Sequence, residues 1–250
     1  MNDTFLKQFV ANEKNATFLK EAMWGPNGIR QAEELASHLK ITTDMKILDL
    51  GVGIGLSSVY LTQAYGTLTF ATDLYADPTE NYEKFQTLGI GDKIIPMILD
   101  ATQPIPFPKG YFDVIFSVGA YNMFGDNEEV LPNFISHVKK GGYIAIAFPG
   151  LKYDFGDNVP QEMKPFWEVP EVARYVRGIE WWKNLFSKAE GIEIISLSEQ
   201  ACHDIAWEEY LATLNPSDEG EWGGDKWTLD MKKAENGKYF NTIQLIAKVT

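Results

Sequence analysis

Short apolar runs alternate with amphipathic stretches along the middle of the chain. The apolar runs occupy residues 46–50, 68–72, 94–99, 112–118 and 143–148. Runs of this kind are typical of strands that are buried on both faces of a parallel sheet. The stretches between them show helical periodicity at residues 56–65, 79–88 and 128–138. The alternation predicts an α/β fold built on a doubly wound, mostly parallel sheet.

The two ends of the chain extend this pattern. Helices are expected at 5–21 and 29–39, with a turn at 23–28 between them. In the second helix one apolar face is formed by Ile29, Ala32, Leu35, Ala36 and Leu39. Towards the C-terminus we expect a helix at 179–188 and strands at 192–197 and 239–249. One face of the last strand is formed by Ile243, Leu245, Ala247 and Val249.

Two segments interrupt the alternation, at residues 150–178 and 201–237. The second is expected to hold a helix near 205–214 and a loop rich in Gly and Trp at 219–227. Both follow strands that should end on the same edge of the sheet, where open α/β sheets bind ligands. We therefore expect one domain over 1–250, with N-terminal helices at 1–45, a cofactor-binding core at 46–149, and two insertions that cap a substrate.

The strongest local motif joins the first strand to the first core helix. Residues 47–57 read Ile-Leu-Asp-Leu-Gly-Val-Gly-Ile-Gly-Leu-Ser. Glycines permit a tight turn and close approach of a ligand, and a helix N-terminus offers free N–H groups. A dinucleotide fingerprint would require Gly or Ala at position 56, where Leu56 stands. A nicotinamide-dependent oxidoreductase is therefore a weaker alternative.

The pattern Asp-x-Gly-x-Gly-x-Gly resembles motif I of the class I S-adenosylmethionine-dependent methyltransferases of small molecules. Asp73 and Asp100 end the next two strands, as acids do in that family, and residues 112–118 and 138–144 are similar to its fourth strand and its turn into the fifth. The resemblance implies a Rossmann-like, seven-stranded sheet with an antiparallel last strand. It also implies the cofactor S-adenosyl-L-methionine.

The resemblance assigns the cofactor-binding residues. The loop would wrap the methionine part of the cofactor through Asp49, Gly51, Gly53 and Gly55. The nucleoside would be held at the ends of the next strands by Asp73, Leu74, Asp100, Ala101 and Ser117. A carboxylate that ends the second strand can accept hydrogen bonds from both ribose hydroxyls, as it does in dinucleotide folds.

The acceptor side is expected around the loop at 119–124, which in the resembled family lies beside the transferable methyl group. Tyr121 is a candidate to hydrogen-bond the acceptor, or to line its pocket. His203 is the candidate base, because histidine titrates near neutrality, although this segment could simply cap a helix. Candidate substrate-binding residues are Trp24, Phe124, Tyr153, Trp167 and Trp207. Aromatic and acidic residues together suit an amine.

The amino-acid composition limits the classes of partner and ligand that the protein is expected to bind. The formal net charge is −13, from 35 acidic and 22 basic residues. This balance disfavours nucleic acid, which is bound largely through Lys and Arg, and no basic patch indicates a membrane surface. The single cysteine, Cys202, excludes an intramolecular disulfide, and the three scattered histidines give no reason to expect a metal. Without a signal peptide or long apolar run, we expect a cytoplasmic protein. A monomer or homodimer is expected, although no sequence feature indicates the oligomeric state.

These observations predict methyl transfer from S-adenosylmethionine to a small-molecule acceptor, with an amine among the candidate classes. Much of the acceleration in such a displacement can come from orientation alone. A non-catalytic cofactor-binding or regulatory protein on the same fold remains an alternative, since fold does not determine function.

Overall fold

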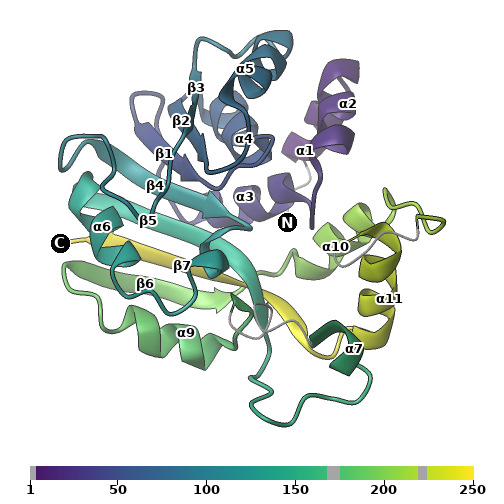
Figure 1. Cartoon of the computed structure of the whole chain (residues 1–250). Helices are drawn as coiled ribbons and strands as arrows, with labels where there is room; N and C mark the ends of the chain where they lie inside the picture. Colours follow the sequence, from purple (N-terminus) through teal and green to yellow (C-terminus); the bar gives the residue numbers. More distant parts are fainter. Residues whose placement is uncertain (1–3, 168–174, 219–223) are drawn as a thin grey trace.

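The computed structural model describes residues 4–167, 175–218 and 224–250. Its centre is a seven-stranded sheet of order β3-β2-β1-β4-β5-β7-β6 (Figure 1). The strands are β1 (Lys46–Leu50), β2 (Leu68–Asp73), β3 (Ile94–Ile98), β4 (Phe112–Val118), β5 (Val138–Leu151), β6 (Ile192–Glu199) and β7 (Phe240–Val249). β7 runs antiparallel to β5 and β6, and the other pairs are parallel. This confirms the predicted sheet and its antiparallel last strand.

Helices cover both faces of the sheet (Figure 1). One face carries α3 (Gly28–Ser37), α4 (Leu56–Tyr65) and α5 (Pro78–Thr87), with α1 (Thr4–Val10) and α2 (Glu13–Ala22) packed outside them. The other face carries α6 (Val130–His137) and α9 (Ile179–Phe186). Each face has its own apolar core, as expected of a three-layer α/β domain.

The predicted single helix at 5–21 is wrong, because the chain breaks at Asn12. The Asn12 side-chain oxygen accepts hydrogen bonds from the backbone N–H groups of Lys14 and Asn15, at 3.0 and 3.3 Å. An asparagine that satisfies these free donors starts a new helix rather than continuing the old one. The turn after α2 is confirmed, and Asn27 caps α3 in the same way through Ile29 N–H.

The predicted faces of α3 and β7 are confirmed. Ile29, Ala32, Leu35 and Ala36 are almost fully buried in the first core. Ile243, Leu245, Ala247 and Val249 lie together in the second core, beside Trp182 of α9. The pattern missed one property of α3, which is that its polar residues Arg30 and Gln31 are also buried.

Both insertions leave the sheet at one edge, as predicted, because β5 and β6 are each antiparallel to β7. The first contains α7 (Lys164–Trp167), and the second contains α10 (His203–Leu211) and α11 (Asp225–Glu235). The loop expected at 219–227 is therefore helical from Asp225, while 219–223 lie outside the described residues, as do 168–174 of the first insertion. β5 is longer than predicted, since it begins at Val138 and ends at Leu151.

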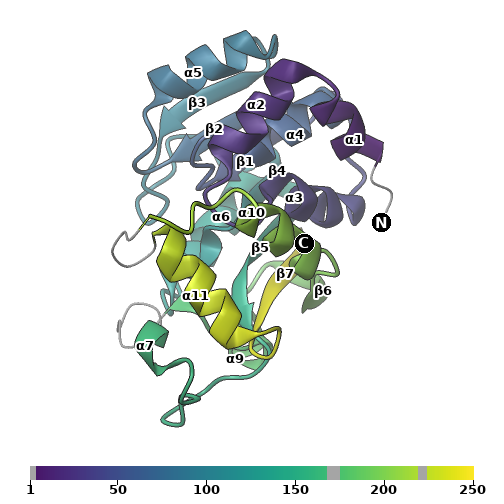
Figure 2. The same cartoon turned by 90° about the vertical axis from the view of Figure 1, so that its right-hand side faces the viewer.

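The insertions share an apolar core of their own, which we call the third core. It lies where α7 and α11 meet the ends of β5 and β7 (Figure 2). Its buried members are Leu151, Phe155, Met163, Met231 and Tyr239. The insertions are thus packed against each other rather than being separate loops. Within the described ranges, no helix has the length and apolarity needed to cross a bilayer.

Candidate functional site

The loop between β1 and α4 depends on three glycines in the left-handed region, with φ of 68° at Gly51, 53° at Gly53 and 102° at Gly55. Side chains rarely adopt such φ values, so the sequence uses glycine here. A Cβ added to Gly51 would collide with Ala120, and one added to Gly55 would collide with Phe85. A Cβ on Gly53 would meet no atom within 4 Å. The loop is therefore closely packed at both ends and open at its centre.

The centre of the loop is fixed by two side chains. Asp73 Oδ2 accepts a hydrogen bond from Gly53 N–H at 2.8 Å, and Asn81 Nδ2 donates to the Gly53 carbonyl at 2.8 Å. The other Asp73 oxygen accepts from the N–H groups of Tyr75 and Ala76. Oδ2 accepts one hydrogen bond and keeps a second lone pair, so Asp73 can still accept a hydrogen bond from a ligand. No sequence signal had singled out Asn81.

Asp49 lies behind this loop. It is fully buried, and the hydroxyl groups of Ser57 and Ser58 donate to its Oδ2 at 2.6 and 2.7 Å. Its Oδ1 has no hydrogen-bond partner among the described residues. Burial raises the pKa of Asp49 to about 7, although the two serine hydrogen bonds act to lower it. Asp49 ties the end of β1 to the first turn of α4 and lines neither of the cavities described next.

Two cavities open at the carboxyl ends of the strands. The first, of about 300 Å³, is lined by the glycine loop, the segment before α3, and the ends of β4 and β5. The second, of about 350 Å³, is lined by the ends of β1 to β4 and the residues that follow them. Gly51 lines both. The contact of Gly51 with Ala120 therefore stands at the boundary between the two cavities.

The second cavity collects most of the predicted nucleoside residues. Its lining includes Asp73, Leu74, Asp100, Ala101 and Ser117, and also Phe124. Hydrogen bonds from the Thr102 hydroxyl and N–H hold the pKa of Asp100 below its usual range, so this carboxylate is charged at neutral pH. Two carboxylates thus face one cavity from neighbouring strand ends.

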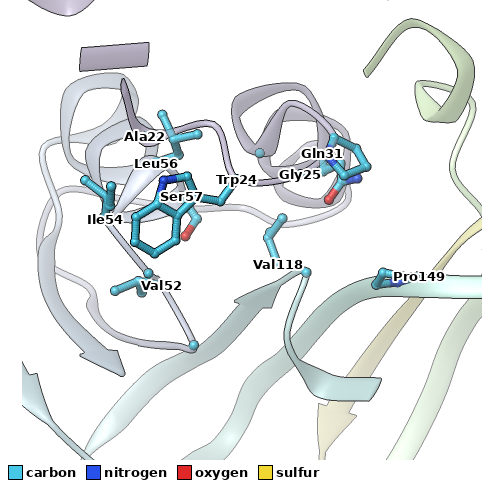
Figure 3. A pocket seen from close by; sticks show the side chains of 15 residues that line it. Ala22, Trp24, Gly25, Gln31, Val52, Ile54, Leu56, Ser57, Val118 and Pro149 are labelled. Carbon is cyan, nitrogen blue, oxygen red and sulfur yellow. The ribbon is translucent and has the colours of Figure 1, made fainter. Parts of the chain in front are cut away.

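The first cavity contains the glycine loop and Trp24, whose side chain is 74% exposed. Figure 3 shows Val52, Ile54 and Ser57 at one end of this cavity and Gln31 and Pro149 at the other. The predicted residues Gly51, Gly53 and Trp24 are therefore brought together. Gly55 instead packs against Phe85.

Tyr121 and His203, the predicted catalytic residues, line neither cavity. Tyr121 is buried in the second core against Phe148 and Trp182, and burial raises its pKa. His203 Nδ1 lies 3.0 Å from the hydroxyl of Thr242, and burial lowers the pKa of His203 to about 4. His203 is therefore uncharged at neutral pH and engaged with β7.

Three predicted substrate-binding aromatic residues lie around the third core. Tyr153 is half exposed and contacts the ring of Tyr239, and Trp167 packs on Phe155 with ring centroids 4.8 Å apart. Trp207 has the Lys232 ammonium 4.7 Å from its ring centroid. None of the three lines either cavity. Trp167 and Trp207 pack in the third core between the insertions, whereas Tyr153 stays half exposed beside it.

Sequence reasoning missed Gln31, which lines the first cavity, and Tyr75, Met123 and Tyr175, which line the second. Gln31 lies off the apolar face that identified α3, so periodicity gave no signal for it. The candidate site also shows no group of side chains arranged to bind a metal, among the described residues. No group of three or more His, Cys, Asp or Glu residues suited to a metal occurs in the described part of the chain.

Comparison with known proteins matches residues 48–146 to a family described as the methyltransferase domain. The chain is 22% identical over 173 residues to Methyltransferase GfsG of Streptomyces halstedii, covering 69% of this chain and 61% of that protein. It spans 48% and 42% of two further curated relatives. Those proteins are therefore longer than the matched region.

Two solved structures illustrate the likeness of fold. Phosphoethanolamine N-methyltransferase 2 of Haemonchus contortus, in complex with S-adenosyl-L-methionine, aligns with a TM-score of 0.71 and 16% identity, over 98% of this chain and 59% of that one. The [4+2]-cyclase SpnF aligns with a TM-score of 0.72 and 13% identity, over 98% and 94%. Residues 48–146, from β1 to β5, match the methyltransferase domain family, and the chain has the fold of the class I S-adenosylmethionine-dependent methyltransferases.

Proposed function

We propose that this protein transfers a methyl group from S-adenosyl-L-methionine to a small-molecule acceptor. The observation that carries the proposal is the pair of cavities that share Gly51, one lined by the glycine loop and the other by Asp73 and Asp100. Each cavity has the size of a small-ligand site, and an elongated cofactor requires two adjoining compartments.

The residues present fit this cofactor. Its nucleoside would occupy the second cavity, where Asp73 Oδ2 would accept from a ribose hydroxyl, Asp100 would face the adenine, and Leu74 and Ala101 would flank it. Its methionine part would occupy the first cavity, over the open backbone of Gly53. When bound, the cofactor supplies a methyl group that the sulfonium charge makes electrophilic.

The protein's contribution is orientation and exclusion of water. Among the described residues that line the first cavity, none carries a side chain that titrates. We therefore assign no general base and place neither His203 nor Tyr121 in the reaction. Alignment of the acceptor behind the methyl group can supply much of the rate enhancement.

An amine is the first acceptor class to test. The charged side chains that line the two cavities, in the part of the chain described, are the carboxylates of Asp73 and Asp100. This charge favours a neutral or cationic acceptor over an anion. A relative of similar fold is named a phosphoethanolamine N-methyltransferase. Cytoplasmic location, a monomeric or homodimeric state and the absence of a nucleic-acid partner stay predictions from the sequence.

The alternative of a non-catalytic cofactor-binding or regulatory protein stays a prediction from the sequence, and the likeness of fold to a cyclase illustrates that this fold does not by itself determine methyl transfer. A nicotinamide-dependent oxidoreductase has no comparable support, because Leu56 replaces the small residue of the dinucleotide fingerprint and is buried in the first core.

Calorimetric titration with S-adenosylhomocysteine, with NADH as the control, tests the proposal. We expect one S-adenosylhomocysteine per chain and no binding of NADH. Transfer of labelled methyl from S-adenosylmethionine to amines then separates an enzyme from a binding protein. Binding of NADH alone, or of neither ligand, contradicts the proposal.

A further inference from the structure

Gln31 is a largely buried residue whose side-chain amide lines the first cavity without a hydrogen-bond partner in the described part of the chain. It is only 4% exposed, yet its side-chain amide makes no hydrogen bond with any of the residues the structure describes. It lines the first cavity, at the end opposite Val52 and Ile54 (Figure 3). The amide therefore offers a donor and an acceptor to whatever fills this cavity, and the geometry points to a ligand that pairs with both.

The main chain of Gln31 is held from two sides. Its N–H donates to the Asn27 carbonyl at 3.3 Å, and its carbonyl accepts from Gln200 Nε2 at 3.0 Å. Gln200 is itself buried, and its Nε2 also donates to Gln244 of β7 at 3.2 Å. Contacts with the end of β6 and the middle of β7 therefore fix the backbone at Gln31. The side-chain amide takes no part in these contacts and lines the cavity.

The rest of the cavity determines what the amide can bind. No Lys, Arg, His, Asp or Glu occurs among its described lining residues, and the Ser57 hydroxyl is already used in donating to Asp49. A neutral amide has both a donor and an acceptor, so it can bind a carboxylate and an ammonium at the same time. A zwitterion without net charge suits this cavity.

We propose that Gln31 recognises the amino-acid end of S-adenosylmethionine, an inference that rests on the proposed function. The side-chain NH₂ donates to the α-carboxylate, and Oε1 accepts from the α-ammonium. The glycine loop in the same cavity contacts the methionine chain, while the nucleoside lies in the second cavity beyond Gly51.

The test compares two ligands that differ only at this end. S-adenosylhomocysteine carries the amino acid, and 5′-methylthioadenosine has the same nucleoside and thioether without it; both have zero net charge. We expect Gln31→Met to weaken S-adenosylhomocysteine about 10- to 100-fold, the range for hydrogen bonds to charged groups. Its affinity for 5′-methylthioadenosine should equal that of the wild type, which also shows that the variant folds.

Gln8→Met is the matched control, because Gln8 lies exposed on α1 and lines neither cavity. It should bind both ligands like the wild type. Unchanged binding of S-adenosylhomocysteine by Gln31→Met overturns the inference, and so does an equal loss for both ligands. If the wild type itself binds no S-adenosylhomocysteine, the proposed function fails and this inference fails with it.

Discussion

At the scale of single residues, Gly53 combines two demands that only glycine meets. Its φ of 53° lies in the left-handed region, and its peptide is held by Asp73 and Asn81. The space around its Cα is open toward the first cavity. Any side chain at position 53 would therefore strain the backbone and also obstruct the first cavity.

We expect Gly53→Val to reduce S-adenosylhomocysteine affinity by about 100-fold and to lower the free energy of unfolding by roughly 1–3 kcal/mol, the usual range for such backbone strain. Calorimetry and thermal unfolding measure the two effects. Gly237→Val is the control, because Gly237 also has positive φ and open space but lies in the turn before β7. Equal loss of affinity in both variants would show that the effect is global.

Asp49 predicts a pH dependence of stability. Its pKa is raised by burial from 3.8 to about 7, so between these pH values the folded protein holds a proton that the unfolded chain has lost. Stability therefore falls as pH rises through this window, by up to about 1.4 kcal/mol per pH unit from this residue. In Asp49→Asn this contribution is absent. Denaturant unfolding from pH 4 to 8 measures the difference, and parallel curves for the two proteins would contradict the argument.

At the scale of elements, α10 of the second insertion is tied to α3 and to the loop that carries Trp24. The Glu209 carboxylate accepts from Asn27 Nδ2 at 2.7 Å and from Arg30 Nη2 at 2.6 Å. Asn27 N–H also donates to the Ala206 carbonyl at 3.0 Å. The wall of the first cavity is therefore held in place by a helix from the other end of the chain.

We expect Glu209→Ala to lower the free energy of unfolding by about 2 kcal/mol, because Asn27 and Arg30 lose a largely buried carboxylate partner. S-adenosylhomocysteine should bind a few-fold more weakly, since the loop before α3 is less fixed. Glu208→Ala is the matched control on the exposed side of α10, with an expected change within about 0.5 kcal/mol. Indistinguishable stabilities of the two variants would show that the tie contributes nothing.

At the scale of the whole molecule, the features that could be predicted from the sequence are those that depend on residues close together in the chain. Apolar runs located the strands, and the glycine loop with Asp73 and Asp100 located the two cavities. Prediction from the sequence failed for side chains whose position depends on contacts between segments that lie far apart in the chain. Tyr121 follows β4 in sequence, but the aromatic residues of α9 draw it into the second core. Trp167 and Trp207 pack in the third core, which exists only because two insertions meet. Gln31 depends on Gln200, which no local pattern connects to α3.

The tie through Glu209 has a consequence for protein engineering. Exchanging the second insertion with that of a relative would leave the glycine loop and both strand-end acids untouched. Such a chimera would leave Asn27 and Arg30 facing a foreign helix. The unit that can be transplanted is therefore discontinuous in sequence, and residues 27–30 must travel with α10.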